Sequence, residues 1–173
     1  MLNREIELTF LPNSLPKEIL KSSSKEILDI YFPTNSKHPV LRLRKYGEKF
    51  EITKKEPVKE GDLSVQVENT IPLTKEEYLE FSYLKGKRVE KTRYYYKENE
   101  QDFEVDIFGG ELKGLVLIDL EFPSVEEKEK FKKPDWLGFD VTNENFIAGG
   151  MICGKKYEDI KNELMKFDYK IIL

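Results

Sequence analysis

The strongest constraint on the fold of this chain is an alternation of apolar and polar residues that recurs along most of its length. The first example is REIELTF, residues 4–10. Successive side chains of a β-strand point to opposite faces, so Glu5, Glu7 and Thr9 share one face and apolar residues share the other. Alone, this segment would indicate an edge strand whose charged face lies in water. Its recurrence, with basic residues in place of acids, requires a common explanation.

Segments of this kind predict about eight strands. They cover residues 4–10, 26–32, 40–44, 50–55, 63–71, 89–96, 102–108 and 115–122. Helical signals lie between and after them, at residues 14–21, 74–85, 124–132, 142–148 and 157–167. Ser14, Thr74 and Ser124 are expected to cap three of these helices, and Gly149-Gly150 is expected to stop the fourth. The chain shows no linker and no internal repeat, so we expect a single domain over residues 1–173.

Residues 40–55 carry the signal of a β-hairpin, with two alternating runs on either side of Gly47. A two-residue turn that begins at this glycine keeps the four apolar residues of the hairpin on one face. The same register pairs two arginines with polar residues of the second strand, Arg42 with Thr53 and Arg44 with Glu51. Lys55 then lies on the arginine face.

Composition excludes several classes of function. The net charge of −4 argues against a general nucleic-acid binder, which is expected to be basic. The single histidine, His38, excludes a site with several histidine ligands, so a metal ion would be held by carboxylates, as Mg²⁺, Mn²⁺ and Ca²⁺ are. The single cysteine, Cys153, excludes an intramolecular disulfide and fits a reducing compartment. Because no apolar run has membrane-spanning length and no signal peptide is recognisable, we expect a cytoplasmic protein without a membrane partner.

Two acids in the most apolar segment argue for a closed sheet. An open sheet with one wet face would satisfy the alternation, but Asp119 and Glu121 lie within LVLIDLEF, residues 115–122. Buried charges there are costly unless they are paired or bind metal. Closing the sheet turns the apolar face outward under the helices and the charged face inward. We therefore predict an α+β fold, an eight-stranded antiparallel β-barrel with a polar, charged interior and flanking helices.

The predicted interior mixes acids and bases. The acids are Glu5, Glu7, Glu68, Glu104, Asp106, Asp119 and Glu121, and the bases are Arg42, Arg44, Lys55, Lys91 and Arg93. This mixture suits a polyanion held together with a divalent metal ion. Arginines bind phosphate oxygens through two parallel hydrogen bonds, and carboxylates hold a metal ion that itself binds phosphate.

These residues resemble the motifs of the CYTH superfamily, the triphosphate tunnel metalloenzymes. Glu5-Ile6-Glu7 is similar to the family's ExExK signature. Further similar segments follow in order: LRLR at 41–44, TKK at 53–55, KTRY at 91–94, FEVD at 103–106, LIDLE at 117–121 and WLG at 136–138. The resemblance runs from Glu5 to about Lys156, and it depends on the order and spacing of the motifs together.

The resemblance implies a tunnel that binds a small-molecule triphosphate or polyphosphate and cleaves a phosphoanhydride with Mg²⁺ or Mn²⁺. It implies that Glu5, Glu7 and Glu121 are catalytic metal ligands, with Asp119 as a further ligand. Phosphate-binding residues by the same carry-over are Arg42, Arg44, Lys55, Lys91, Arg93 and, closing the tunnel, Lys155 (or Lys156). Glu68, Glu104 and Asp106 would line the tunnel, and Glu68 and Asp106 would either orient basic residues or complete the metal shell. Water, rather than a side chain, would attack the terminal phosphorus.

Two departures from the family pattern affect substrate binding. Thr9 replaces the lysine of the signature and would line the tunnel without bringing a charge, and Gln66 stands where a second acid often accompanies Glu68. Three alternatives stay open: a class IV-type adenylyl cyclase, a non-catalytic polyphosphate or nucleotide binder, and a β protein with no tunnel. The protein could be a monomer or a homodimer.

Overall fold

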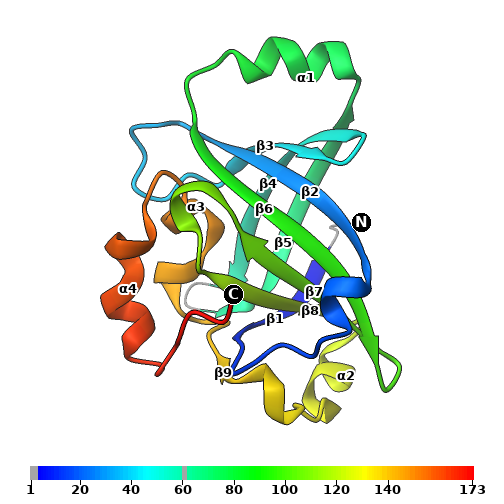
Figure 1. Ribbon diagram of the computed structural model, residues 1–173. Coiled ribbons are helices and arrows are strands. Elements are labelled where there is room, and N and C mark those ends of the chain that lie inside the picture. The colour runs from blue at the N-terminus through cyan, green and yellow to red at the C-terminus, as the bar shows by residue number, and fades with distance from the viewer. Residues whose placement is uncertain (1–3, 60–61) are drawn as a thin grey trace.

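Eight antiparallel strands close into a barrel (Figure 1). The computed structural model describes residues 4–59 and 62–173. The strands of the described part are β1 (Arg4–Leu11), β2 (Ser23–Phe32), β3 (Leu41–Tyr46), β4 (Lys49–Lys59), β5 (Asp62–Leu73), β6 (Lys87–Glu98), β7 (Gln101–Phe108), β8 (Val116–Glu121) and β9 (Phe139–Asp140). They form one sheet in the order β5-β4-β3-β2-β6-β7-β8-β1-β9.

Within residues 4–59 and 62–173, four α-helices and four 3₁₀ turns accompany the sheet. The helices are α1 (Lys75–Ser82), α2 (Val125–Lys130), α3 (Gly149–Ile152) and α4 (Tyr157–Met165). The 3₁₀ turns are η1 (Ile19–Lys21), η2 (Gly110–Leu112), η3 (Asp135–Leu137) and η4 (Asn145–Ile147). Figure 1 shows α1 and α2 at opposite ends of the sheet, with α3 and α4 together at one side. No helix within the described ranges combines the length and apolar character needed to span a membrane.

Strand β1 closes the barrel by dividing its pairing between two partners. Its first residues pair with β5, where Glu5 lies opposite Gln66. Its later residues pair with β8, where Glu7 lies opposite Glu121 and Thr9 opposite Asp119. The prediction of an eight-stranded antiparallel barrel is therefore confirmed, with β9 added as a short extension on β1.

The β3–β4 hairpin has the predicted register. Arg42 pairs with Thr53 and Arg44 with Glu51. Gly47 has a φ of 56°, in the left-handed region that glycine adopts without steric cost and that two-residue hairpin turns require. Because the register is fixed, both arginines point into the barrel.

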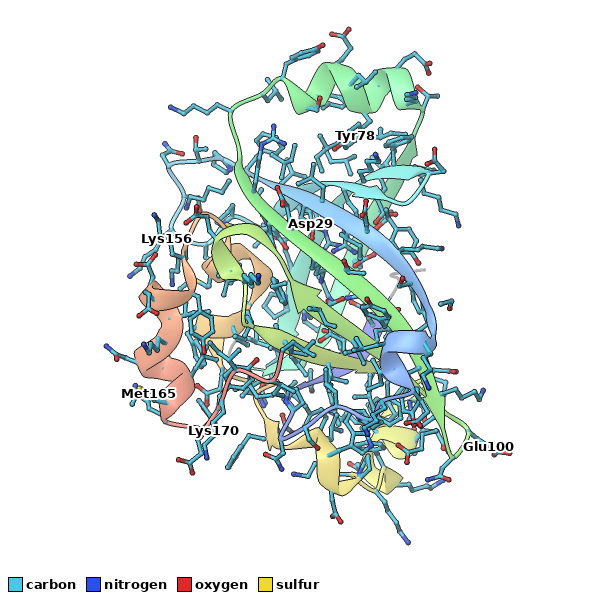
Figure 2. The ribbon with its side chains drawn as sticks, viewed as in Figure 1. Asp29, Tyr78, Glu100, Lys156, Met165 and Lys170 are labelled. Carbon is cyan, nitrogen blue, oxygen red and sulfur yellow. The ribbon has the colours of Figure 1, made fainter. Side chains whose placement is uncertain are left out.

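The outward faces of the strands are covered as expected. Ile30 and Leu43 pack with Tyr78, which α1 places against the sheet (Figure 2). A second cluster centred on Val105 and Ile118 lies beneath Leu137 of η3. Thr74 and Ser124 cap α1 and α2 as predicted, and Thr74 forms the full capping box with Glu77.

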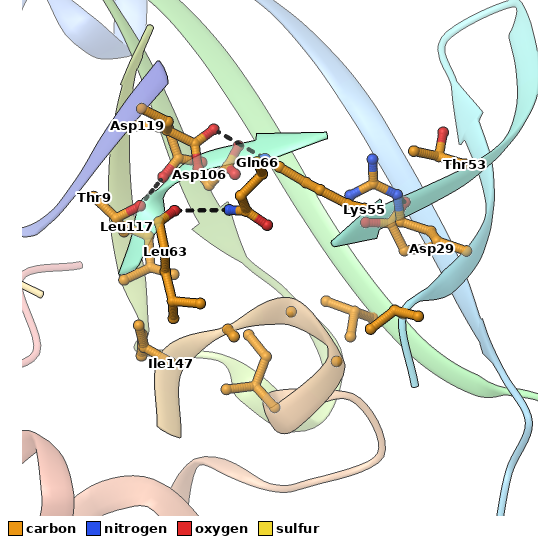
Figure 3. A pocket seen from close by; sticks show the side chains of 18 of the residues that line it. Thr9, Asp29, Thr53, Lys55, Leu63, Gln66, Asp106, Leu117, Asp119 and Ile147 are labelled. Atoms are coloured by element: carbon orange, nitrogen blue, oxygen red, sulfur yellow. Dashed lines mark hydrogen bonds and ion pairs between the residues drawn. The ribbon is translucent and has the colours of Figure 1, made fainter. Parts of the chain in front are cut away.

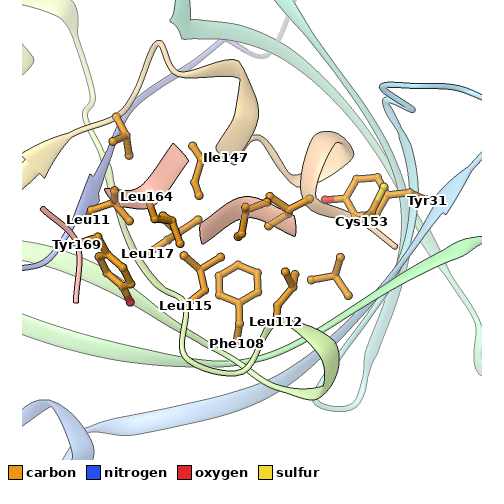
Figure 4. Packing of buried hydrophobic residues seen from close by; sticks show 14 residues of the cluster. Leu11, Tyr31, Phe108, Leu112, Leu115, Leu117, Ile147, Cys153, Leu164 and Tyr169 are labelled. Carbon is orange, nitrogen blue, oxygen red and sulfur yellow. The ribbon is translucent and has the colours of Figure 1, made fainter. Parts of the chain in front are cut away.

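One part of the interior is apolar. Tyr31, Phe108 and Leu117 belong to the cavity wall and also to a buried cluster that includes Ile147 of η4 and Leu164 of α4 (Figure 4). The segment from η4 through α3 thus lines the apolar part of the cavity, and α4 packs against the same buried cluster. The charged residues occupy the remaining part.

Three helix predictions need correction. The helix expected from Ser14 is only the single turn η1, which begins at Ile19 with Glu18 as its N-cap, while the backbone N–H groups of Asn13 and Ser14 donate to the Trp136 carbonyl. The helix expected over residues 142–148 is only the 3₁₀ turn η4. Gly149 does not stop a helix but begins α3. A Cβ at Gly149 would lie 2.2 Å from the Tyr31 hydroxyl, so this glycine serves close packing.

Gly150 provides a test of this packing. A Cβ added there would lie 2.2 Å from the Pro39 carbonyl oxygen, a backbone atom that cannot move aside cheaply. We expect Gly150→Ala to lower the free energy of unfolding by about 1–3 kcal/mol, measured by denaturant titration. Gly109→Ala is the matched control, since its Cβ would meet nothing nearer than 3.9 Å, and it should change stability by less than about 0.5 kcal/mol. Equal effects of the two substitutions would contradict the packing explanation.

Candidate active site

All eight barrel strands contribute to one charged cavity of about 280 Å³. Its acids are Glu5, Glu7, Asp29, Glu51, Glu68, Asp106, Asp119, Glu121 and Glu144, and its bases are Arg42, Arg44, Lys55, Lys91 and Arg93. Where one strand contributes two of them, they lie two or four residues apart, because only every second side chain points inward. The alternation that predicted strands is therefore also what supplies the site.

Three glutamates converge at the junction of β1 and β8. One carboxylate oxygen from each of Glu5, Glu7 and Glu121 lies within 4.8 Å of the others. Glu7 and Glu121 are direct cross-strand partners, a placement that is unfavourable for like charges. Burial and the charges of Glu5 and Glu104 raise the pKa of Glu121 to about 7, and burial followed by Glu5 raises the pKa of Glu7 despite the opposing charge of Lys55. Convergent carboxylate oxygens of this kind fit a hard divalent cation.

Lys55 brings a positive charge to this cluster from β4. Its ammonium group forms an ion pair with Glu5 and lies 3.4 Å from a carboxylate oxygen of Glu7. Burial alone would lower the pKa of Lys55, but the charges of Glu7 and Glu5 raise it above its ordinary value. Lys55 therefore remains protonated beside the glutamates of β1.

Asp106 of β7 organises two bases of β6. Both of its oxygens accept hydrogen bonds of 2.7 Å from Arg93, and one also contacts the Lys91 ammonium. Arg93 contacts Glu104 as well, and its Nη2 lies 3.2 Å from Asp119. Burial would raise the pKa of Asp106, but Arg93 and Lys91 lower it to about 2. The resemblance leaves two roles open for Asp106, orienting basic residues or completing the metal shell. This geometry supports the first.

Thr9 uses its hydroxyl to hold Asp119. Its Oγ1 donates a 2.9 Å hydrogen bond to Asp119 (Figure 3). Burial and the charge of Glu7 raise the pKa of Asp119 to about 6. Thr9 thus orients a carboxylate at the position where the signature lysine would bring a positive charge.

Asp29 is a site residue that the sequence reasoning missed. It is 1% exposed on β2 and accepts hydrogen bonds from Nε and Nη2 of Arg44, at 2.6 and 2.8 Å. Arg42 Nε lies 3.9 Å from the same carboxylate. The signal that could have found it is an acid set among apolar residues in EILDIYF, residues 26–32.

Sequence relatives identify the family. No family model matches the chain. It is 38% identical over 142 residues to an inorganic triphosphatase of Nitrosomonas europaea, which covers 81% of this chain and 90% of the relative. It is 32% identical over 166 residues to an inorganic triphosphatase of Acetivibrio thermocellus, covering 92% and 99% of the two chains. The chain belongs to the CYTH superfamily.

A solved structure agrees with this assignment. The crystal structure of an inorganic triphosphatase superposes on the CYTH barrel described above with a TM-score of 0.63 and 28% identity. The superposition covers 90% of this chain and 97% of the other. The resemblance inferred from the motifs is confirmed.

Some residues implied by the CYTH motifs lie apart from the cavity. Lys155 follows α3 and is not among the residues that line the cavity, and Lys156 forms a surface ion pair with Glu111 at 3.3 Å. Glu104 does not line the cavity, but it forms an ion pair with Arg93, which does. Gln66 lines the cavity, but its amide nitrogen donates to the Leu63 carbonyl (Figure 3).

The lowered pKa of Asp106 predicts a pH-dependent contribution to stability. The folded-state pKa of about 2 lies below the ordinary 3.8, so ionised Asp106 stabilises the fold above about pH 4 and loses that effect as the pH falls toward 2. The shift corresponds to about 2 kcal/mol. We expect the difference in unfolding free energy between the wild type and Asp106→Asn to shrink by that order between pH 5 and pH 2. Asp102→Asn, on the same strand with a 79% exposed side chain, should show no such change.

Proposed function

We propose that this protein is a metal-dependent triphosphatase that hydrolyses a phosphoanhydride bond of inorganic tripolyphosphate or a related triphosphate inside the barrel. The observation that carries the proposal is the cluster of Glu5, Glu7 and Glu121 in a cavity that five bases on other strands also line. Two relatives covered over 90% or more of their length are inorganic triphosphatases, which favours the same reaction here.

The charge of the cavity supports a requirement for cations. Among the described residues, nine acids and five bases line it, a formal excess of four negative charges. A polyanion would be repelled by such a lining unless protons or metal ions came with it. Glu5, Glu7 and Glu121, with Asp119 nearby, are the residues that would hold Mg²⁺ or Mn²⁺. When bound, such an ion neutralises charge on phosphate oxygens and polarises the phosphorus.

The side chains of the protein perform the remaining tasks. Arg42, Arg44 and Arg93 bind phosphate oxygens through their planar guanidinium groups and hold the phosphate chain in line. Lys91 lies on the strand between those of Asp29 and Asp106, and it adds a further positive charge close to the bound phosphates. A carboxylate of the cluster that a bound cation leaves free would accept the proton of the attacking water.

A non-catalytic polyphosphate binder is the second candidate, and Thr9 is the observation that favours it. Its hydroxyl is committed to Asp119 and adds no charge to stabilise a leaving group. Adenylyl cyclase activity is distinguished from both candidates by its product.

Product analysis tests the proposal. Phosphate, pyrophosphate and cyclic AMP should be measured from tripolyphosphate, ATP and thiamine triphosphate, with Mg²⁺ and with Mn²⁺. We expect release of phosphate, and we expect Glu5→Gln and Glu121→Gln each to lower kcat/KM on the order of 100-fold. Glu126→Gln, an exposed acid of α2, is the control and should leave kcat/KM unchanged. Tight tripolyphosphate binding without turnover would favour the second candidate.

Metal affinity should depend on pH in a defined direction. Because the pKa of Glu121 is raised to about 7, protons compete with a cation below that pH. We expect the affinity for Mn²⁺, measured by calorimetry, to fall up to about tenfold per unit as the pH drops from 7 to 6. Glu121→Gln should bind more weakly and show a flatter dependence. A wild-type affinity independent of pH would argue against these ligands.

A further inference from the structure

Two buried aspartates on opposite sides of Lys91 make the same contact with an arginine. Strand β6, which carries Lys91, lies between β2 and β7. Asp106 of β7 accepts two hydrogen bonds from Arg93, and Asp29 of β2 accepts two from Arg44. Both aspartates are 1% exposed. Figure 2 shows Asp29 inside the barrel, on the strand that faces the viewer.

We propose that Asp29 is a positioning residue for polyphosphate: it fixes Arg44 in one orientation, leaves the Nε–H of Arg42 without a hydrogen bond, and offsets the charge of both arginines so that the cleaved product is released. This inference rests on the proposed function, because it assigns Arg42 and Arg44 to phosphate binding.

The geometry accounts for the positioning. The Nε–Nη2 edge of Arg44 is held by both carboxylate oxygens, a two-bond contact that fixes the plane of the guanidinium. Arg44 is thereby committed to one direction while its other edge remains for a ligand. An arginine held only by its flexible stem would have to be ordered at each binding event.

Arg42 is left in a different state. Its Nε lies 3.9 Å from Asp29, too far for a hydrogen bond, and is buried without any hydrogen-bond partner among the described residues. A buried, unpaired N–H is uncommon and indicates a missing partner. Since Arg42 lines the cavity, a phosphate oxygen is a partner of the right charge.

The charge of Asp29 weakens anion binding at the same place. Burial would raise the pKa of Asp29, but Arg44 and Arg42 hold it well below its ordinary range, so the group is ionised at neutral pH. Without Asp29, Arg42 and Arg44 would present two positive charges with no contacting carboxylate at this wall. A negative charge among them reduces attraction for substrate and product alike, and it favours turnover if product release is slow.

Asp29→Asn removes this charge while nearly preserving the side chain's shape. We expect KM for tripolyphosphate to fall about threefold to tenfold and kcat to fall about tenfold, with stronger inhibition by pyrophosphate. Asp29→Glu keeps the charge but displaces the carboxylate, so kcat should fall without a lower KM. Asp102→Asn, whose partner Lys97 lies 3.6 Å away on the surface, is the control for net charge and should change neither constant. Unchanged constants in Asp29→Asn, or a raised KM with unchanged kcat, would overturn the proposal.

An NMR measurement on the wild-type protein tests the proposal even where the Asp29 variants fail to fold. NMR resonances of the arginine Nε–H groups, assigned with Arg42→Lys and Arg44→Lys, should show a protected Arg44 signal that tripolyphosphate leaves in place. The Arg42 signal should shift on binding. The opposite pattern, or no binding of tripolyphosphate, would overturn the inference. A shift of Arg42 in a protein that hydrolyses no triphosphate would support the positioning of polyphosphate but overturn both the role in product release and the proposed function.

Discussion

The site depends on the backbone pairing of β1 with β5. Without it, the sheet would be an open surface with its charged face in water, and β1 would lie at one side, far from β4 in the sheet order. The pairing of Glu5 with Gln66 closes the circle and brings Lys55 of β4 against the glutamates of β1. A few backbone hydrogen bonds thus convert separate charged strands into one enclosed volume, in which charges interact far more strongly than in water.

Enclosure separates the interior acids into two groups. Asp29 and Asp106 each accept two hydrogen bonds from an arginine, and their pKa values are lowered. Asp119 and Glu121 lie beside other acids, and their pKa values are raised. The first group orders bases, while the second group remains available to a cation or a proton. Neighbouring groups with pKa values displaced in opposite directions are a frequent sign of divided chemical roles.

The sequence predicts the parts of the site that depend on local periodicity. Alternation identifies which side chains share a face, and the turn at Gly47 fixes the register of Arg42 and Arg44. The partner of Arg44 could not be predicted in the same way, because the period of a strand does not tell which strands are neighbours. Asp29 meets Arg44 only because β2 pairs with β3 in one particular register. The family motifs indicated the acids of the metal cluster but said nothing of Asp29.

The errors in the helices have a similar origin. Gly149-Gly150 resembles a helix stop by composition, but its glycines are required by contacts with Tyr31 and Pro39, which are distant in sequence. Ser14 resembles a cap, but Asn13 and Ser14 donate to the carbonyl of Trp136, more than a hundred residues later, and the turn that follows begins only at Ile19. Local signals were reliable at Thr74 and Ser124, whose side chains accept hydrogen bonds from the N–H groups of Glu77 and Glu127.

The long separation between β1 and β8 has a consequence for how the chain reaches its native state. Thr9 and Asp119 are 110 residues apart in sequence, and Glu7 meets Glu121 across a similar span. Contacts of such range form late, since the loop between them must first be ordered. During synthesis on the ribosome, β1 leaves the exit tunnel first but must wait for nearly three quarters of the chain before β8 can pair with it. Until then the carboxylates of β1 lack their opposing glutamate, so the acidic cluster is assembled only when the barrel is almost complete.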